Sequence, residues 1–225
     1  MTRSIRGDDC TTCRVGRVIR IWRLIILISM VAELTKILKA YAVFEIQVRT
    51  QIAQFCAPFC SVCESVCCRP EYCRETIDSP FLTLLRSKAL QNTAYDAKRG
   101  WLTPTGCALS AGRPPVCYQF NCKKIIDSLP DDYYRYLLGV LSEMVAYVGK
   151  RAIGTRHLVE AMNATELGRL NADRILKRLS EARIALEAIQ SFAGNGALPD
   201  SALEVLKKIK PRPASRSHAQ GYFDV

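Results

Sequence analysis

Residues 31–55, VAELTKILKAYAVFEIQVRTQIAQF, contain no glycine or proline and predict one long helix. The apolar residues recur at three- and four-residue spacing, as one face of a helix requires: Leu34, Leu38, Tyr41, Val48, Ile52 and Phe55, widened by Ile37 and Phe44. Such a stripe packs against other helices in a globular core. Because a run of cysteines follows at once, the last turn of this helix is expected to deliver Cys56 to that run.

The cysteines are concentrated directly after the helix. Nine of the eleven lie between Cys56 and Cys122, and residues 56–73 read CAPFCSVCESVCCRPEYC. C-x2-C spacing and adjacent cysteines between long helices are untypical of a secreted disulfide scaffold and suit metal ligation. The sequence therefore predicts a metal site and a reducing, cytoplasmic location.

Two separate segments supply the thiols. Thiolates bind zinc at about 2.3 Å, and short spacings on tight turns bring them that close together. The first segment carries Cys60, Cys63, Cys67 and Cys68, and the second carries Cys107, Cys117 and Cys122. These are more donors than one four-coordinate ion needs, so two metal ions, or one metal cluster with spare thiols, is the expectation.

Both segments resemble a known family. CSVCESVCC (60–68) is similar to the CxxCxxxCC signature of the YkgJ-type zinc- or iron-chelating cysteine-cluster domain. GCALSAGRPPVCYQFNC (106–122) is similar to the second half of that signature, with Arg113 and Pro114 at its Arg-Pro step. The resemblance implies zinc or iron, with a [4Fe–4S] cluster as one form. The ligands that it implies are Cys60, Cys63, Cys67, Cys68, Cys107, Cys117 and Cys122. Cys56 and Cys73 lie outside the signature, and their roles stay open.

A rival motif overlaps the first segment. Cys56-x3-Cys60-x2-Cys63 has the spacing with which radical SAM enzymes hold a [4Fe–4S] cluster. Those enzymes place the motif in a βα barrel, whereas here it follows a long helix and no strand–helix alternation comes after it. Cys10 and Cys13 form a further C-x2-C pair with no second pair nearby, and we interpret this pair as incidental.

The region 56–130 is rich in proline and glycine, which interrupt any long element. Residues 81–91 predict a short helix with Ser79 as its cap and Pro80 in its first turn. Residues 100–109 predict a short hairpin or extended segments. Because such a region buries little apolar surface, metal is expected to organise it. Five basic residues beside the thiols either offset the thiolate charge or form a solvated basic rim: Arg69, Arg74, Arg113, Lys123 and Lys124.

Helical patterns return after Pro130. Residues 131–150 begin with acidic residues and end with Gly-Lys, as a helix dipole favours. A short helix is expected over 155–163, where His157 is interpreted as a surface or packing residue and not as a ligand, and a longer helix is expected over 172–192. A turn then leads to a last helix at 202–209. The predicted fold is mostly α: a long N-terminal helix and a C-terminal helical hairpin flank an irregular, metal-stabilised Cys-rich lobe.

The predicted organisation has four parts. Residues 1–29 form a basic extension, 30–130 the helix and Cys-rich metal-binding domain, 131–209 a helical region and 210–225 a disordered tail. Three interpretations of 1–29 stay open: translation upstream of a true start at Met30, a membrane-surface anchor, or a signal peptide. The uncharged run from Leu24 to Ala32 is about half as long as a membrane span requires.

Charge and motifs narrow the function classes. The formal net charge is +11, but most of it lies in the two ends of the chain, so nucleic-acid binding by the body is weakly supported. No Ser-His-Asp, HExxH or phosphate-loop motif occurs, so no catalytic residue is assigned. The sequence predicts a metal-binding cysteine-cluster protein whose cluster serves as a fold staple or as a module for a protein partner. An iron–sulfur redox protein or enzyme is the alternative, and a nucleic-acid-binding zinc module comes third. Residues 14–32 are also expected to make a weak contact with a membrane surface.

Overall fold

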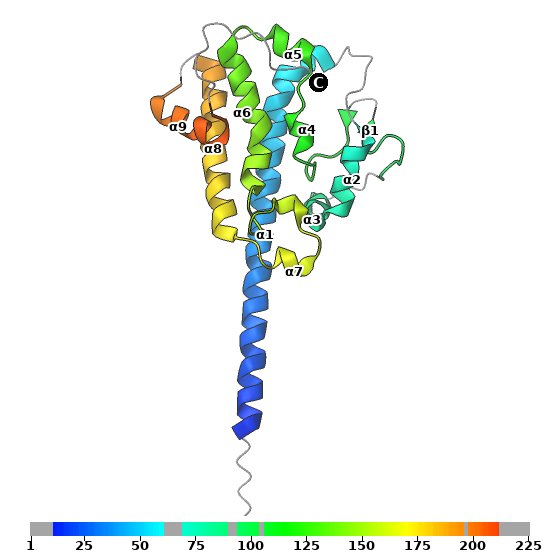
Figure 1. Cartoon of the computed structure of the whole chain (residues 1–225), viewed down its shortest axis with the longest axis vertical. Coiled ribbons are helices and arrows are strands. Elements are labelled where there is room, and N and C mark those ends of the chain that lie inside the picture. The colour runs from blue at the N-terminus through cyan, green and yellow to red at the C-terminus, as the bar shows by residue number, and fades with distance from the viewer. Residues whose placement is uncertain (1–10, 61–68, 90–93, 104–105, 196–197, 212–225) are drawn as a thin grey trace, which may run out of the picture.

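The computed structural model is mostly helical (Figure 1). It describes residues 11–60, 69–89, 94–103, 106–195 and 198–211, and the side chains of 11–27 and 193–195 are not described. In the described chain the elements are α1 (Thr11–Cys60), α2 (Pro70–Asp78), α3 (Pro80–Lys88), β1 (Leu102–Thr103), β2 (Gly106–Cys107), α4 (Val116–Gln119), α5 (Lys123–Ser128), α6 (Asp132–Gly149), the 3-10 helix η1 (Leu158–Glu160), α7 (Ala164–Leu167), α8 (Ala172–Asn195) and α9 (Asp200–Ile209).

Three long helices form the body of the molecule. α1, α6 and α8 pack against one another, and α9 folds back onto α8 and α6 (Figure 1). Each of the three buries an apolar stripe. On α8 all five positions that the sequence predicted are buried, and Ala185 and Ala188 are buried with them; the predicted five are Ile175, Leu179, Ala182, Leu186 and Ile189. The predicted C-terminal helical hairpin and its packing on the N-terminal helix are confirmed.

The N-terminal helix is longer than predicted. A helix was expected from residue 31, but α1 begins at Thr11 and runs without interruption to Cys60, with Pro58 inside its last turn. The boundary at residue 29 is therefore not a helix boundary. No described helix of the chain is long and apolar enough to cross a membrane. The predicted disordered tail lies almost entirely outside the described residues.

The Cys-rich lobe shares the main core, which the sequence did not predict. Phe81, Leu82 and Leu85 of α3 are fully buried and belong to the same apolar cluster as the stripes of α1, α6 and α8. The lobe therefore packs partly by the hydrophobic effect, and the expectation that it buries little apolar surface is wrong for α3. The start of α3 is as predicted: the Ser79 hydroxyl accepts from the Leu82 amide, and Pro80 occupies the first turn.

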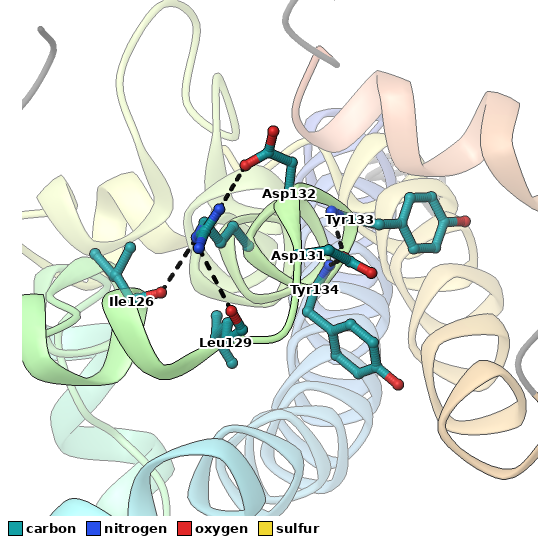
Figure 2. A network of polar contacts seen from close by, with 7 residues as sticks. Ile126, Leu129, Asp131, Asp132, Tyr133 and Tyr134 are labelled. Atoms are coloured by element: carbon teal, nitrogen blue, oxygen red, sulfur yellow. Dashed lines mark hydrogen bonds and ion pairs between the residues drawn. The ribbon is translucent and has the colours of Figure 1, made fainter. Parts of the chain in front are cut away.

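Side-chain caps fix the turn between α5 and α6 (Figure 2). An Asp131 carboxylate oxygen accepts from the amides of Tyr133 at 2.8 Å and Tyr134 at 2.9 Å, which starts α6 where the acidic pattern predicted. The Arg135 guanidinium donates to the carbonyls of Ile126 at 3.3 Å and Leu129 at 3.4 Å, at the C-terminal end of α5. The start of α6 is thereby tied to α5.

The short helix expected over 155–163 is wrong. Instead, the His157 ring and the Asn163 side chain each start a new turn, η1 and α7, because both accept backbone amides. His157 is a packing residue, as predicted. Its Nε2 lies 2.9 Å from the Ala146 carbonyl, which can only accept, and its Nδ1 accepts from the Val159 amide. The Nδ1 contact requires the neutral ring with its proton on Nε2, and burial lowers the pKa of His157.

We expect this histidine to make the protein less stable in mild acid. A base whose folded-state pKa is lowered contributes stability above its unfolded pKa, near 6.5, and that stability is lost as the pH falls below this value at up to about 1.4 kcal/mol per pH unit. Urea unfolding at several pH values should show this slope. His157→Gln should remove it, whereas replacing the other histidine, His218→Gln, should leave it unchanged. An unaltered slope in His157→Gln would contradict the assignment.

A cysteine-lined cavity as the candidate functional site

Three of the sequence-predicted thiols line one cavity of about 650 Å³. Cys73 comes from α2, Cys107 from β2 and Cys117 from α4, so three separate segments converge there. Arg69 and Arg113 also line the cavity. Apolar and aromatic groups complete the wall: Leu102, Val116, Tyr72 and Phe120. Cys73, whose role the sequence left open, is thus placed with two of the implied ligands.

The other described cysteines lie elsewhere. Cys56 and Cys122 both pack against a small apolar cluster of Ile125, Leu129 and Leu138, where the end of α1 meets α5 and α6. Cys60 is exposed at the end of α1. Cys63, Cys67 and Cys68 lie outside the described residues. Among the residues that are described, no three cysteine, histidine, aspartate or glutamate side chains are grouped closely enough to hold a metal ion.

A buried carboxylate holds the wall of the cavity in place. Glu45 of α1 is fully buried, and its Oε2 accepts from the Gly112 amide at 2.8 Å. Its Oε1 accepts from the Arg113 amide at 2.8 Å and from the Tyr118 hydroxyl at 2.7 Å. Burial raises the pKa of Glu45, and the hydrogen bonds oppose that shift. One side chain of the long helix therefore positions both the Gly112–Arg113 turn and α4.

Arg113 extends this network to the thiols. Its Nε donates to the Leu109 carbonyl at 2.9 Å, and its Nη2 donates to the Cys107 carbonyl at 3.1 Å. The guanidinium thereby ties the turn after β2 to the strand that carries Cys107. On the other side, the Thr76 hydroxyl of α2 donates to the Gly112 carbonyl at 2.9 Å. The segments that bear Cys73, Cys107 and Cys117 are all joined to the turn that Glu45 holds.

Close packing also fixes Cys73. A Cβ at Gly100 would lie 2.6 Å from the Cys73 Sγ, so the thiol lies directly against the Gly100 backbone. Gly100 precedes the β1–β2 hairpin, which has the antiparallel pairing Leu102 with Cys107 and confirms the predicted hairpin. The absence of a side chain at residue 100 lets α2 approach the hairpin and brings Cys73 to the cavity that Cys107 also lines.

The electrostatic surroundings of the cavity are positive. Arg49 lies one turn after Glu45, within electrostatic reach of Arg113 and Cys107. Burial lowers the pKa of Arg49, and the neighbouring Arg113 adds to the effect. The guanidiniums of Arg49 and Arg113 thus lie near the buried carboxylate of Glu45. In the cavity wall itself, Arg69 and Arg113 outnumber one carboxylate, Glu71. A positive excess of this kind stabilises thiolates and other anions.

The structure places only two of the five basic residues beside the thiols at the cavity. Arg69 and Arg113 line the cavity, whereas Arg74 pairs with Asp78 at 3.6 Å on the surface and Lys123 and Lys124 are exposed on α5. Sequence reasoning missed Glu45, Tyr118 and Arg49. A signal for Glu45 existed: the three- and four-residue spacing that runs from Tyr41 to Val48 includes position 45, where a charged residue stands on the buried face.

Comparisons with known proteins add no relatives: the chain matches no protein-family model, no curated protein and no solved structure. The resemblance to the cysteine-cluster family therefore stays a prediction from the sequence motifs.

Proposed function

We propose that this chain is a metal-binding cysteine-cluster protein that holds zinc or iron, with an iron–sulfur cluster as one form of the iron. The observation that carries the proposal is the convergence of Cys73, Cys107 and Cys117, from three different segments, on one cavity with a positive surrounding. Thiolates are soft ligands that suit zinc, iron and iron–sulfur centres, and bound thiolates are negatively charged. The type of donor and the charge of the cavity therefore suit such a group, and binding would draw the three thiols closer together than the described residues place them.

The proposed ligands come from both motif segments. Cys107 and Cys117 line the cavity, and the resemblance adds Cys60, Cys63, Cys67, Cys68 and Cys122. The position of Cys73 supports it as a further donor. When bound, the metal would link α2, the hairpin and α4, which join the main core less extensively than α3 does. The proposed role of the metal is to hold these segments together, so that their outer surface can contact a protein partner.

Metal analysis of the full chain, purified without air, tests the proposal. We expect zinc or iron in integral stoichiometry. Acid-labile sulfide with visible charge-transfer absorption identifies an iron–sulfur cluster, and a colourless zinc protein identifies the simple site. Cys107→Ser and Cys117→Ser should each lose metal, because a four-coordinate site loses a strong ligand.

The chain offers a matched control in its isolated cysteine pair. The double variant Cys10→Ser/Cys13→Ser removes two thiols outside both motifs and should retain the full metal content. Cys73→Ser decides whether this thiol is a ligand. Metal-free wild-type protein, in which all thiols react readily with a thiol reagent in the native state, would refute the proposal.

A further inference from the structure

The N-terminal part of α1 projects from the molecule. Figure 1 shows residues 11 to about 30 as a helix that stands clear of the other described elements. Met30 contacts the body, since a Cβ at Gly168 would lie 2.5 Å from the Met30 Cε. Ile28 and Val31 are 60% and 58% exposed. The projecting part is about 28 Å long at 1.5 Å per residue.

Such a helix needs something to cover it. Isolated helices of this length are marginal in water, because most helical stability in proteins comes from packing of an apolar face. The residues of this segment are mainly branched apolar residues and arginines. The body leaves Ile28 and Val31, at its end, exposed. The surface that covers this helix must therefore accept both apolar groups and positive charge.

The helical positions separate these two kinds of residue. At 100° per residue, one side of the helix receives an apolar set and the opposite side receives an arginine set. The apolar set is Val15, Val18, Ile19, Trp22, Ile25 and Ile26, and the arginine set is Arg14, Arg17, Arg20 and Arg23. By the same geometry Ile21, Leu24, Leu27 and Ile28 fall on the arginine side, so the two kinds of residue separate except at Ile21, and after Arg23 the helix is apolar on all sides. This is the pattern of helices that lie in a membrane interface.

We propose that residues 14–32 bind the surface of an anionic phospholipid bilayer. No aspartate or glutamate occurs between residues 10 and 32, so a second copy of the segment could cover its apolar side but would bring only further arginines and no counter-charge. An anionic bilayer supplies an apolar phase and phosphate groups together. Tryptophan favours the boundary between these two phases, and Trp22 stands beside Arg23 where the basic part gives way to the apolar run.

Vesicle flotation of the full chain tests this inference independently of any metal. We expect binding to vesicles of phosphatidylcholine and phosphatidylglycerol in equal amounts, weaker binding at high salt, and little binding to phosphatidylcholine alone. Arg14→Gln/Arg17→Gln/Arg20→Gln/Arg23→Gln should lower the partition coefficient roughly 10²–10³-fold. A control with the same charge change at exposed sites on the body, Lys88→Gln/Lys98→Gln/Lys150→Gln/Lys177→Gln, should bind within about threefold of the wild type.

Tryptophan fluorescence supplies a second readout. The only other tryptophan, Trp101, is 1% exposed, so a blue shift on adding anionic vesicles would report Trp22. Trp22→Phe should abolish the shift and retain flotation. The proposal is overturned by absence of flotation with anionic vesicles, by equal binding to phosphatidylcholine, or by a dimer in solution that Ile25→Glu/Ile26→Glu dissociates. Unchanged urea unfolding of each variant shows that the body remains folded.

Discussion

Replacing Glu45 by alanine is expected to lower the free energy of unfolding by about 3–5 kcal/mol, because it leaves two buried donors and one part-buried donor without their acceptor. These donors are the Gly112 amide, the Arg113 amide and the Tyr118 hydroxyl. The loss is expected to be local as well as global, since the same carboxylate joins α1 to the wall of the cysteine-lined cavity. The Cys107 and Cys117 thiols should therefore react faster with a thiol reagent under native conditions.

Urea unfolding and native thiol titration measure the two effects. Glu33→Ala is the matched control, because Glu33 is an exposed glutamate of the same helix and its loss should change stability by no more than about 0.5 kcal/mol. Glu45→Gln keeps the shape of the side chain but replaces one acceptor oxygen by a donor, so its loss should be intermediate. If Glu45→Ala and Glu33→Ala unfold alike, the carboxylate does not position the cavity wall.

Gly112→Ala is expected to cost about 3–4 kcal/mol, from two causes that act together. Gly112 has a φ of +83°, which a residue with a Cβ adopts at a cost. The new Cβ would also lie 2.9 Å from the Leu82 carbonyl oxygen and 3.3 Å from the Arg86 amide of α3. These are backbone atoms of a helix in the main core, so they cannot move aside as a flexible side chain would.

A second glycine separates the two causes. Gly154 has a φ of +60°, and no described atom lies within 4 Å of the position of its missing Cβ. Gly154→Ala should therefore show the backbone cost alone, about 1–2 kcal/mol. Thermal or urea unfolding of the two variants gives the difference. Equal losses would show that the turn does not press against α3, and that the contact between the Gly112 turn and the core is looser than described.

Glu45→Ala and Gly112→Ala also bear on the proposed metal site. Both should loosen the segment that carries Cys107 and Cys117 while leaving every thiol in the sequence. Reduced metal content in Glu45→Ala would then reflect positioning and not the loss of a ligand. Because outer-shell changes of this kind typically weaken metal binding about 10–100-fold, a competition assay with a chelator should detect them before unfolding does.

Local patterns were sufficient to predict α3, α6, α8 and α9, whereas α2, α4 and α5 were not predicted and the helix expected over 155–163 was wrong. The spacing of apolar residues along α8, the Ser79–Pro80 start of α3 and the Asp131 cap of α6 each depend on residues a few positions apart. The same is true of the hairpin at 100–109. The start of α1 was missed, because the apolar stripe of 31–55 belongs to the packed part of the helix, whereas the part before it has no core to face.

The amino-acid sequence by itself determined that the protein is mostly helical and that its thiols gather in two short segments. Only the tertiary structure decided which thiols meet. Cys73 joins Cys107 and Cys117 because α2 packs closely against Gly100, while Cys122 lies with Cys56 beside α5. Only the fold explains Glu45, a charge on a buried helix face whose partners lie 67 to 73 positions later in the chain. Periodicity and caps are set between neighbouring residues, whereas these contacts exist only after distant segments have packed onto a common core.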